Sequence, residues 1–427
     1  MRVERLDRAG EAAVRVGGPR MLRVLNDRAA LYALLRCGPL SRVELEQEIG
    51  LSKPAAAELL RRLEEARLVR RAGHRPTGAP GPNAQLWTVN EKAGYAVAAD
   101  VTTFGVDVVI ADLSGAVVAE RKISTRRAEV DPAAAVRTAI TDAARAHGLG
   151  LDELRRVVIG ISGSIDPVTG FLEYATHMPR WHGFDLPTRL GEVLSLPVAV
   201  ENDVNLVAMD EVLHGTAAGY RDVILLWMSQ GVAAAVVLGG RLHRGARGAA
   251  GEIDLAPVGA NSTTASALLD SRGVTELARR HGIAASRGSV AVRRASAVAS
   301  EDHERNPGDH DGFLAALADR IAQCMVGAVA LLDPEVLILA GDIGLAGGDR
   351  LASRVTDRLH RMVGHRPTVR PGTGRPNAVR HGAMDAAIRQ TREMIFSDAL
   401  GPDDRDDSLM HYPVGPSSRR RSIHRKV

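Results

Sequence analysis

Cysteine is nearly absent from this chain, which has only Cys37 and Cys324 among its 427 residues. We expect the two to lie in separate domains. So sparse a pair supplies neither a disulfide framework nor a cysteine-ligated metal site. The sequence therefore predicts a protein of a reducing compartment, the cytoplasm.

Long apolar runs and a one-sided charge are also missing. No run approaches the roughly 20 apolar residues of a membrane-spanning helix, and the N-terminus has no apolar signal-peptide core. We therefore expect no membrane partner. The formal net charge is only +4, from 55 Lys and Arg against 51 Asp and Glu. A general binder of polyanions is thereby excluded, and basic residues must cluster locally to indicate nucleic acid.

What is present is the composition of a soluble globular protein, with 45% hydrophobic and 25% charged residues. A chain of this length buries a substantial core and divides into two or three domains. We expect a flexible arm over residues 1–20, a small domain over 21–90, a large α/β domain over 95–396 and a disordered basic tail over 397–427.

The small domain contains the start and stop signals of three short helices. The first starts near Met21 and stops at Cys37, before a Gly-Pro pair. Ser41 and Glu44 match the capping box of a second helix, which Gly50 ends. Ser52 is the expected cap of a third helix, which runs to about Glu65 with an apolar face of Ala56, Leu59, Leu60 and Leu63.

Two helices joined by a short glycine turn are typical of a helix-turn-helix, with the helix after Ser52 as the recognition helix. Strands over residues 68–71 and 85–89, joined by a basic Gly/Pro-rich loop over 73–82, complete a predicted wing. A solvated helix face is the alternative for these basic residues. The first turns of the third helix would read bases, and the arginines would bind phosphates. The residues we expect at DNA are Ser41, Arg42, Ser52, Lys53, Ala55, Ala56, Glu58, Arg61, Arg62, Arg70, Arg71 and Arg75.

The large domain alternates strands and helices over two lobes. The first lobe covers about 95–200 and regains the last helix, 378–394, while the second covers about 201–377. Its strands are expected over 95–100, 106–111, 117–122, 157–161, 196–200, 223–228, 232–238 and 336–339. Its helices are expected over 131–147, 187–193, 204–215, 265–281, 313–332, 349–362 and 378–394, with an irregular charged segment over 282–311.

Polar groups gather at the ends of these elements between residues 201 and 254. Glu201-Asn202-Asp203 directly follows an apolar strand, and Glu252-Ile253-Asp254 closes a glycine-rich turn. Ligands of α/β proteins lie at such strand ends, and carboxylates and amides hold sugar hydroxyls by paired hydrogen bonds. Capping of the following helix is the alternative for Asn202 and Asp203.

This segment resembles the ROK family of sugar kinases and sugar-responsive repressors, on the actin-like ATPase fold. The resemblance runs from about Tyr95 to Phe396, and the preceding helix-turn-helix is similar to the regulator branch. Further motifs that resemble the family are Trp181-His182-Gly183-Phe184-Asp185-Leu186, Asp333-Pro334-Glu335-Val336 and Arg380-His381-Gly382-Ala383. The Trp181-His182 pair is expected to be a packed loop rather than a ligand contact.

The family's nucleotide-binding turns are altered here. The first, Asp-x-Gly-Gly-Thr in kinases, reads Asp100-Val-Thr-Thr-Phe104, and the second, Gly-Thr-Gly-x-Gly, reads Ser229-Gln-Gly-Val-Ala233. The glycine-rich adenosine loop reads Ala340-Gly341-Asp342, which brings a carboxylate. Without the glycines, backbone N–H groups lose their close approach to phosphate. We therefore expect no ATP binding and no kinase activity.

The resemblance also implies a zinc site that this chain lacks, because residues 255–275 contain neither Cys nor His. We predict no metal and no cofactor. The sugar site implied by the resemblance is better kept. It comprises Gly163, Asn202, Asp203, Glu252 and Asp254, with Asp203 as a vestigial catalytic base and Asp254 near the position of a lost His.

The sequence therefore predicts an α/β protein with an N-terminal winged helix-turn-helix and a two-lobed actin-like ROK domain. Its predicted function is a sugar-responsive DNA-binding regulator, with repressor as the favoured sign of regulation. Its predicted partners are operator DNA, a sugar effector and further copies of itself in a homodimer or tetramer. Two alternatives remain open. One is an active sugar kinase with a DNA-binding domain, and the other is a ligand-independent regulator that uses the ROK domain for dimerisation.

Overall fold

The computed structural model describes residues 19–76, 83–124, 131–175, 178–259, 263–297, 308–364 and 366–400. These residues form two compact units. Unit 1 contains the residues up to Ala93 together with those from Arg392 on, and unit 2 runs from Gly94 to Thr391. The expected N-terminal arm, the tip of the expected wing and the basic tail lie outside the described residues.

Unit 1 is built on helices α1 to α3 and a small sheet with the strand order β1-β3-β2. A short strand, β1, precedes the second helix and pairs with β3, so the sheet ties the start of α2 to the hairpin that follows α3. The elements are α1 (Pro19–Cys37), β1 (Leu40–Ser41), α2 (Arg42–Ile49), α3 (Lys53–Glu65), β2 (Val69–Arg75) and β3 (Ala84–Val89).

The helix caps of unit 1 are those that the sequence predicts, with one exception. The capping box of α2 is confirmed, because the Glu44 N–H donates to Ser41 Oγ at 3.3 Å and the Ser41 N–H donates to Glu44 Oε2 at 2.8 Å. Gly50 ends α2 in the left-handed region, at φ 69°. Ser52 occupies the N-cap position of α3, but its side chain makes no capping bond. The expected role of the Ser52 hydroxyl as a cap is therefore wrong.

Unit 1 buries the apolar stripe of α3 and, near the end of the last helix, α12 (Ala378–Leu400), the Phe396 ring. Ala56, Leu59, Leu60 and Leu63 are at most 3% exposed. The final turns of α12 belong to unit 1, where the Phe396 ring meets Tyr32 of α1 edge-to-face at 5.8 Å. α12 is thus longer than the predicted 378–394 and contributes residues to both units.

Unit 2 repeats one topology in two five-stranded sheets. In each, three antiparallel strands are extended by two parallel strands beside the first of them, with the orders β10-β7-β4-β5-β6 and β13-β12-β11-β16-β17. The first sheet contains β4 (Tyr95–Thr102), β5 (Gly105–Ala111), β6 (Val117–Ser124), β7 (Leu154–Ile161) and β10 (Val198–Asn202). The second contains β11 (Val223–Met228), β12 (Val232–Leu238), β13 (Arg241–His243), β16 (Val336–Ala340) and β17 (Thr368–Pro371).

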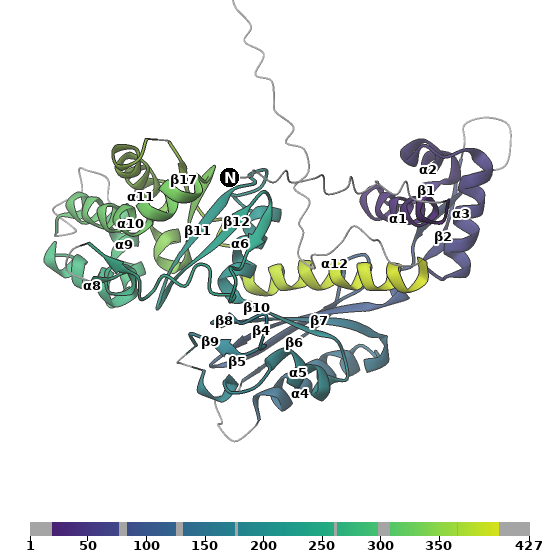
Figure 1. Ribbon diagram of the computed structural model, residues 1–427, viewed down its shortest axis with the longest axis horizontal. Coiled ribbons are helices and arrows are strands. Elements are labelled where there is room, and N and C mark those ends of the chain that lie inside the picture. The colour runs from purple at the N-terminus through teal and green to yellow at the C-terminus, as the bar shows by residue number, and fades with distance from the viewer. Residues whose placement is uncertain are drawn as a thin grey trace, which may run out of the picture. The chain divides into compact units, whose positions relative to one another are not determined.

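Helices cover both faces of the first sheet. On one face lie α4 (Pro132–Ala146) and α5 (Leu186–Leu194), and α12 lies across the other (Figure 1). Small residues of α12, including Ala383 and Ala387, are buried against Ala96 and Ala98 of β4. The last helix thus packs on the sheet of the first half of unit 2.

The link between the two sheets is α6 (Asp203–His214). The helices of the second half are α7 (Ala265–Leu269), α8 (Ser271–Arg280), α9 (Gly288–Ala297), α10 (His310–Leu332) and α11 (Gly341–Met362). Short pairs β8 (Ser164–Ile165) with β9 (Leu172–Glu173), and β14 (Pro257–Val258) with β15 (Thr263–Thr264), lie in connections. The largest core of unit 2 gathers around α10 and α11.

Four expectations for this half are corrected. The single helix predicted over 265–281 is two, because Asp270 ends α7 and caps α8 by accepting the Gly273 N–H at 2.7 Å. The segment 282–311 is not wholly irregular, since it contains α9. The predicted helix from Asp349 is present, but α11 also contains an unpredicted helical segment from Gly341, which a kink at Gly348 separates from it. Finally, α10 is long and apolar enough to span a membrane by length and composition alone, whereas no such run was expected. Its Phe313, Leu317 and Ile321 are completely buried, as in a core helix.

Candidate functional site

Asn202 and Gly163 meet where two neighbouring parallel strands end. β10 pairs with β7 in register, with Asn202 opposite Ile161, so the segment after β7 runs beside the end of β10. The Asn202 Nδ2 group donates to the Gly163 carbonyl oxygen at 3.0 Å, and Asn202 Oδ1 accepts the Asn205 N–H at 2.9 Å. Asn202 therefore both caps α6 and holds the loop after β7.

Gly163 has no room for a side chain. Its φ is +105°, and a Cβ would lie 2.6 Å from the Glu173 carbonyl oxygen and 2.7 Å from the Ala175 Cβ. Only glycine lets this loop pass so close to β9, and the loop in turn presents its carbonyl oxygen to Asn202.

Glu201 forms a buried polar network beneath this site, which sequence reasoning did not assign. Its side chain is 5% exposed. One carboxylate oxygen accepts from the Asn202 N–H at 3.0 Å and from Asn205 Nδ2 at 2.8 Å, and the other accepts from Arg244 Nε at 2.7 Å. The strand-end position of Glu201 was visible in the sequence, but its partner lies 43 residues away. Through the bond to its backbone N–H, the network holds Asn202 in place.

Burial and neighbouring carboxylates raise the pKa of two acidic residues, Glu252 and Asp100. Burial raises the pKa of Glu252 to about 7, with Asp254 and Asp203 as further causes. Burial likewise raises the pKa of Asp100 to about 6, followed by the charges of Asp203 and Asp107. A buried carboxyl that titrates near neutral pH can donate or accept a hydrogen bond. The charges of Asp203 and Asp254 thus act on Glu252, and the charge of Asp203 acts on Asp100 as well.

A glycine turn carries Glu252 to this group. Gly251 has φ +100°, and a Cβ on it would lie 2.0 Å from the Ala234 carbonyl oxygen. The Ala234 N–H donates to the Gly251 carbonyl oxygen at 2.8 Å, so the turn is bound directly to β12. No side chain fits between the turn and the strand, and this fixes where Glu252 projects.

The three turns compared with the family's nucleotide-binding turns lie at the ends of strands. Phe104 stands in the β4–β5 turn with 63% of its side chain exposed. The turn over 229–231 joins β11 to β12, and the Ser229 carbonyl oxygen accepts the Ser271 N–H at 2.8 Å. Gly341 has φ +75°, and a Cβ on it would lie 2.2 Å from the Met228 carbonyl oxygen, so this turn still requires glycine.

The Trp181 side chain lies outside this group of polar residues. It is 7% exposed and belongs to the apolar core of the first lobe. The neighbouring His182 Nε2 is 2.8 Å from the Ala175 carbonyl oxygen. Both residues therefore hold a packed loop, as expected.

In unit 1, the predicted DNA-contacting arginines are paired with carboxylates. Arg61 bonds Glu58 at 2.6 Å, Arg70 bonds Glu91 at 2.6 Å and Arg71 bonds Glu64 at 3.1 Å. Arg42 pairs with Glu46, and Arg75 with Glu44. Ion pairs at the surface contribute little to stability, so a phosphate can replace the carboxylate. Within the described residues, Lys53 makes no ion pair.

Three predicted DNA contacts serve the fold instead, and one of them, Ser41, is 8% exposed with its hydroxyl engaged in the capping box of α2. Ala56 is 1% exposed and packs with the apolar stripe of α3, so it cannot reach a thymine methyl group and we withdraw it as a base-reading residue. Arg62 bonds Asp27 of α1 at 2.5 Å, and Asp27 is 3% exposed. This arginine neutralises a buried carboxylate and joins α3 to α1. Ser52, Lys53, Ala55 and Glu58 remain exposed on α3.

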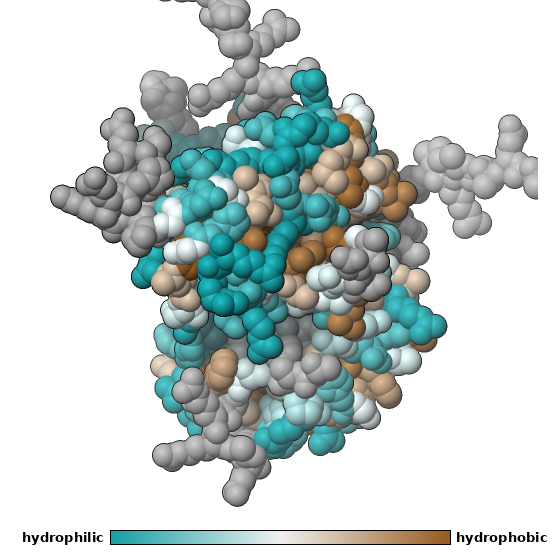
Figure 2. Space-filling view, turned by 90° about the vertical axis from the view of Figure 1, so that its left-hand side faces the viewer, coloured by the Kyte–Doolittle hydropathy of each residue, from teal (hydrophilic) through white to brown (hydrophobic). Residues whose placement is uncertain are grey.

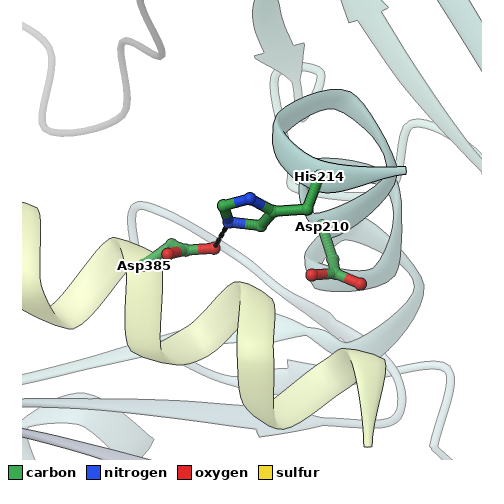
Figure 3. Close-up of side chains that lie close together, drawn as sticks. All are labelled: Asp210, His214 and Asp385. Carbon is green, nitrogen blue, oxygen red and sulfur yellow. Dashed lines mark hydrogen bonds and ion pairs between the residues drawn. The ribbon is translucent and has the colours of Figure 1, made fainter. Parts of the chain in front are cut away.

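A further cluster joins α6 to α12 in unit 2. Asp210 and His214 lie one turn apart on α6, and His214 Nε2 is 2.8 Å from Asp385 Oδ2 of α12 (Figure 3). One ligand atom from each of the three residues lies within 4.8 Å of the others, which would suit a metal ion. However, the Arg375 guanidinium bonds Asp210 and also His381. Because this cation already neutralises Asp210, the cluster is better described as a polar brace between two helices.

Comparison with protein families matches residues 97–389 to the ROK family. Over 191 residues the chain is 33% identical to the bifunctional enzyme NanE/NanK of Brucella melitensis, covering 44% of this chain and 34% of that enzyme. Over 234 residues it is 24% identical to the xylose repressor of Bacillus subtilis, covering 54% of this chain and 60% of the repressor. The chain thus spans about a third of the length of the NanE/NanK enzyme and about three fifths of the length of the xylose repressor.

Among solved structures, the fold is similar to that of a ROK family transcriptional regulator described as a homologue of the E. coli MLC protein. The TM-score is 0.62, with 17% sequence identity, and the match covers 89% of this chain and 98% of that one. Identity this low indicates a shared fold and nothing about shared ligands.

Proposed function

Since this chain belongs to the ROK family, we propose that it is a transcriptional regulator in which unit 1 binds operator DNA and unit 2 senses a sugar or sugar derivative. The observation that carries the proposal is the construction of α3. This helix buries Ala56, Leu59, Leu60 and Leu63 and leaves Ser52 and Lys53 exposed at its start. A short turn at Gly50 joins it to α2, and the β2–β3 hairpin follows, in the order of a winged helix-turn-helix.

The sensor assignment rests on Asn202, Asp203 and Glu252. They lie around the start of α6, at the carboxyl end of β10, where α/β proteins bind ligands. Carboxylates and an amide are suited to the hydroxyl groups of a sugar. Gly163 and Asp254 complete the proposed set, Asp254 through its charge on Glu252.

A route from this site to the DNA-binding unit runs along two helices. Asn202 and Asp203 start α6, and the other end of α6 is held to α12 by the His214–Asp385 contact. The last turns of α12 belong to unit 1, where Glu393 bonds Arg28 of α1 at 2.6 Å. A sugar that moves the start of α6 would thereby bias unit 1. Coupling of this kind amounts to about 1–3 kcal/mol.

We further propose a homodimer or tetramer in the cytoplasm, because helix-turn-helix proteins read paired half-sites as dimers. The direct test is selection of duplexes from a random DNA pool by the full-length protein, followed by binding titrations with and without a panel of sugars. The proposal would be supported if one DNA sequence is enriched and if one sugar changes the affinity of the protein for that DNA. Failure to enrich any sequence would contradict it.

An active sugar kinase is the second candidate, favoured by the retained Asp203 and by 27% identity over 272 residues to a glucokinase of Halalkalibacterium halodurans. In such an enzyme Asp203 would accept the proton of the sugar hydroxyl during phosphoryl transfer. The loss of the glycine turns opposes it. ADP release that depends on a sugar and disappears in Asp203→Asn would replace the regulator as our conclusion.

A ligand-independent regulator is the third candidate. It is favoured by Asn202, because both groups of its side-chain amide are already hydrogen-bonded within the chain. Thermal unfolding over a panel of free sugars and amino sugars separates this candidate from the sensor. A ligand that binds only the folded state raises the unfolding temperature, and a sensor must show one such sugar.

A further inference from the structure

One ion pair of unit 2, between Glu201 and Arg244, is built on a buried carboxylate. The outer face of unit 2 that carries α8 and α9 is largely hydrophilic, with apolar patches between the polar side chains (Figure 2). The pair between Glu276 and Arg279 of α8 is exposed to water, where such pairs contribute little. The Glu201 and Arg244 side chains, in contrast, are only 6% and 32% exposed. A buried pair adds little net stability over apolar side chains of similar volume, so its presence is better explained by the arrangement that it fixes.

This ion pair joins the two sheets of unit 2. Glu201 belongs to β10, at the edge of the first sheet, and Arg244 directly follows β13, at the edge of the second. Arg244 Nε donates to Glu201 Oε2 at 2.7 Å. The other carboxylate oxygen accepts from the Asn202 N–H and from Asn205 Nδ2. One carboxylate therefore connects the end of the second sheet to the residue that caps α6.

The segment 244–252 follows β13 and contacts elements of both halves of unit 2. Gly248 has φ +73°, and a Cβ on it would lie 2.1 Å from the Ile165 carbonyl oxygen of β8. Towards the end of the segment, the Gly251 carbonyl oxygen accepts the N–H of Ala234 in β12 at 2.8 Å. Glycine at both positions permits this close approach. The segment is therefore in contact with β8 of the first half and with β12 of the second.

Backbone hydrogen bonds connect Arg244 to Glu252 within this segment. The Ala250 N–H donates to the Arg244 carbonyl oxygen at 3.0 Å, and the Glu252 N–H donates to the Ala249 carbonyl oxygen at 3.2 Å. The Arg244 side chain holds the start of the segment against its carboxylate partner, and these bonds extend the restraint to Glu252. Since the same carboxylate also holds the cap of α6, two parts of the proposed sugar site are linked through one charged group.

We propose that Arg244 is a positioning residue, which holds Glu252 in a fixed place relative to Asn202 through its ion pair with Glu201 and thereby sets the affinity for the sugar. The positioning depends on contacts within the chain, whereas its effect on a sugar rests on the proposed function. Arginine is suited to this role, because its Nε and one terminal nitrogen both lie 2.7 Å from the same Glu201 oxygen. Such a planar group restrains direction as well as distance.

The test compares the full-length wild type with Glu201→Gln/Arg244→Met. This double variant removes the ion pair without leaving a buried charge unpaired, so the fold should keep its stability. The matched control is Asp27→Asn/Arg62→Met, which removes a pair of similar burial, with side chains 4% and 24% exposed, from unit 1. Hydrogen exchange of the 244–252 amides is measured without ligand, and the affinities for D-glucose, D-xylose and D-glucosamine are measured by calorimetric titration.

We expect the 244–252 amides to exchange several-fold faster in Glu201→Gln/Arg244→Met and at the wild-type rate in the control. Exchange of β16 should stay the same in all three proteins, which separates a local effect from a loss of stability. A sugar that binds the wild type should bind the first variant at least about tenfold more weakly, the equivalent of one lost hydrogen bond to a charged group. Arg244→Lys, which keeps a cation beside Glu201, should recover part of this affinity.

Unchanged exchange of the 244–252 amides in Glu201→Gln/Arg244→Met would overturn the proposal, because the segment would then be held without the pair. Faster exchange with an unchanged sugar affinity would overturn it as well, and so would an equal loss of sugar affinity in the control. If exchange is faster but none of the three sugars binds the wild type, the result counts against the sugar sensor alone. The positioning of Glu252 by Arg244 then stands, because exchange is measured without ligand.

Discussion

Glu393 of α12 and Arg28 of α1 form an ion pair at 2.6 Å, although 365 residues separate them. Arg28 is 7% exposed, and the Tyr32 hydroxyl donates to the other oxygen of the same carboxylate. This carboxylate thus joins the last helix to the first helix of unit 1. A buried arginine that loses its partner is costly, so the pair should matter for stability.

We predict that Glu393→Gln lowers the free energy of unfolding of unit 1 by about 1–3 kcal/mol, the cost of a charged group left without its partner. Circular dichroism during urea unfolding measures it. Asp398→Asn is the matched control, because Asp398 is an exposed carboxylate on the same helix. Equal stability of the two variants would show that the pair contributes nothing.

Lys53 and Arg62 of α3 should behave differently. Lys53→Ala should weaken operator binding and reduce the slope of log affinity against log salt by about one, since one phosphate contact is lost. Arg62→Ala should instead destabilise the fold by about 1–3 kcal/mol, because Asp27 stays buried without its guanidinium. Titrations at several salt concentrations and unfolding curves separate the two effects. Lys92→Ala, an exposed change in the same unit, should alter neither quantity.

Much of this fold could be predicted from the sequence, because the signals that mark its strands and helix ends lie within a few neighbouring residues. Strands β11 and β12 were predicted to the residue from their apolar runs, and the Ser41 capping box was visible within one turn of helix. Local signals also misled. The break at Asp270 was hidden inside a continuous helical pattern, and α9 was hidden in a charged segment. Ala56 was assigned to both the core and DNA, and its burial decides for the core.

The proposed sugar site was predictable in part for the same reason. Asn202, Asp203 and Glu252 stand at the ends of regular elements, which a sequence displays. The Glu201–Arg244 bond and the effect of Asp203 on Asp100 could not be seen, because they depend on how distant strands align. The expected absence of a metal and of ATP binding stays a prediction.

The pKa of Glu252 gives a test that depends on pH. Its folded value, about 7, is raised above the ordinary value of 4.5, so its neutral form favours folding. The corresponding stability is complete below pH 4.5 and is lost as the pH rises through about 7. We predict that Glu252→Gln, which stays neutral, unfolds at a higher temperature than the wild type at about pH 8 and at a similar temperature at about pH 5.

The control for this pH test is Glu192→Gln, which removes an exposed carboxylate of α5. It should leave the difference between the two pH values as it is in the wild type. A Glu252→Gln protein with the wild-type pH dependence would mean that Glu252 is ionised throughout and that burial is less important than the structure indicates.

The contact between His214 and Asp385 should matter for response rather than for binding. His214→Ala removes the bond between the end of α6 and α12 while leaving Asn202, Asp203 and Glu252 in place. We predict that this variant still binds operator DNA and still shows a sugar-dependent rise in unfolding temperature, but that the sugar changes its operator affinity several-fold less than in the wild type. His243→Ala, an exposed change on β13, is the control and should respond normally. If His214→Ala responds as the wild type does, the signal does not pass through this pair, and coupling along α6 and α12 must be abandoned while sugar sensing itself stands.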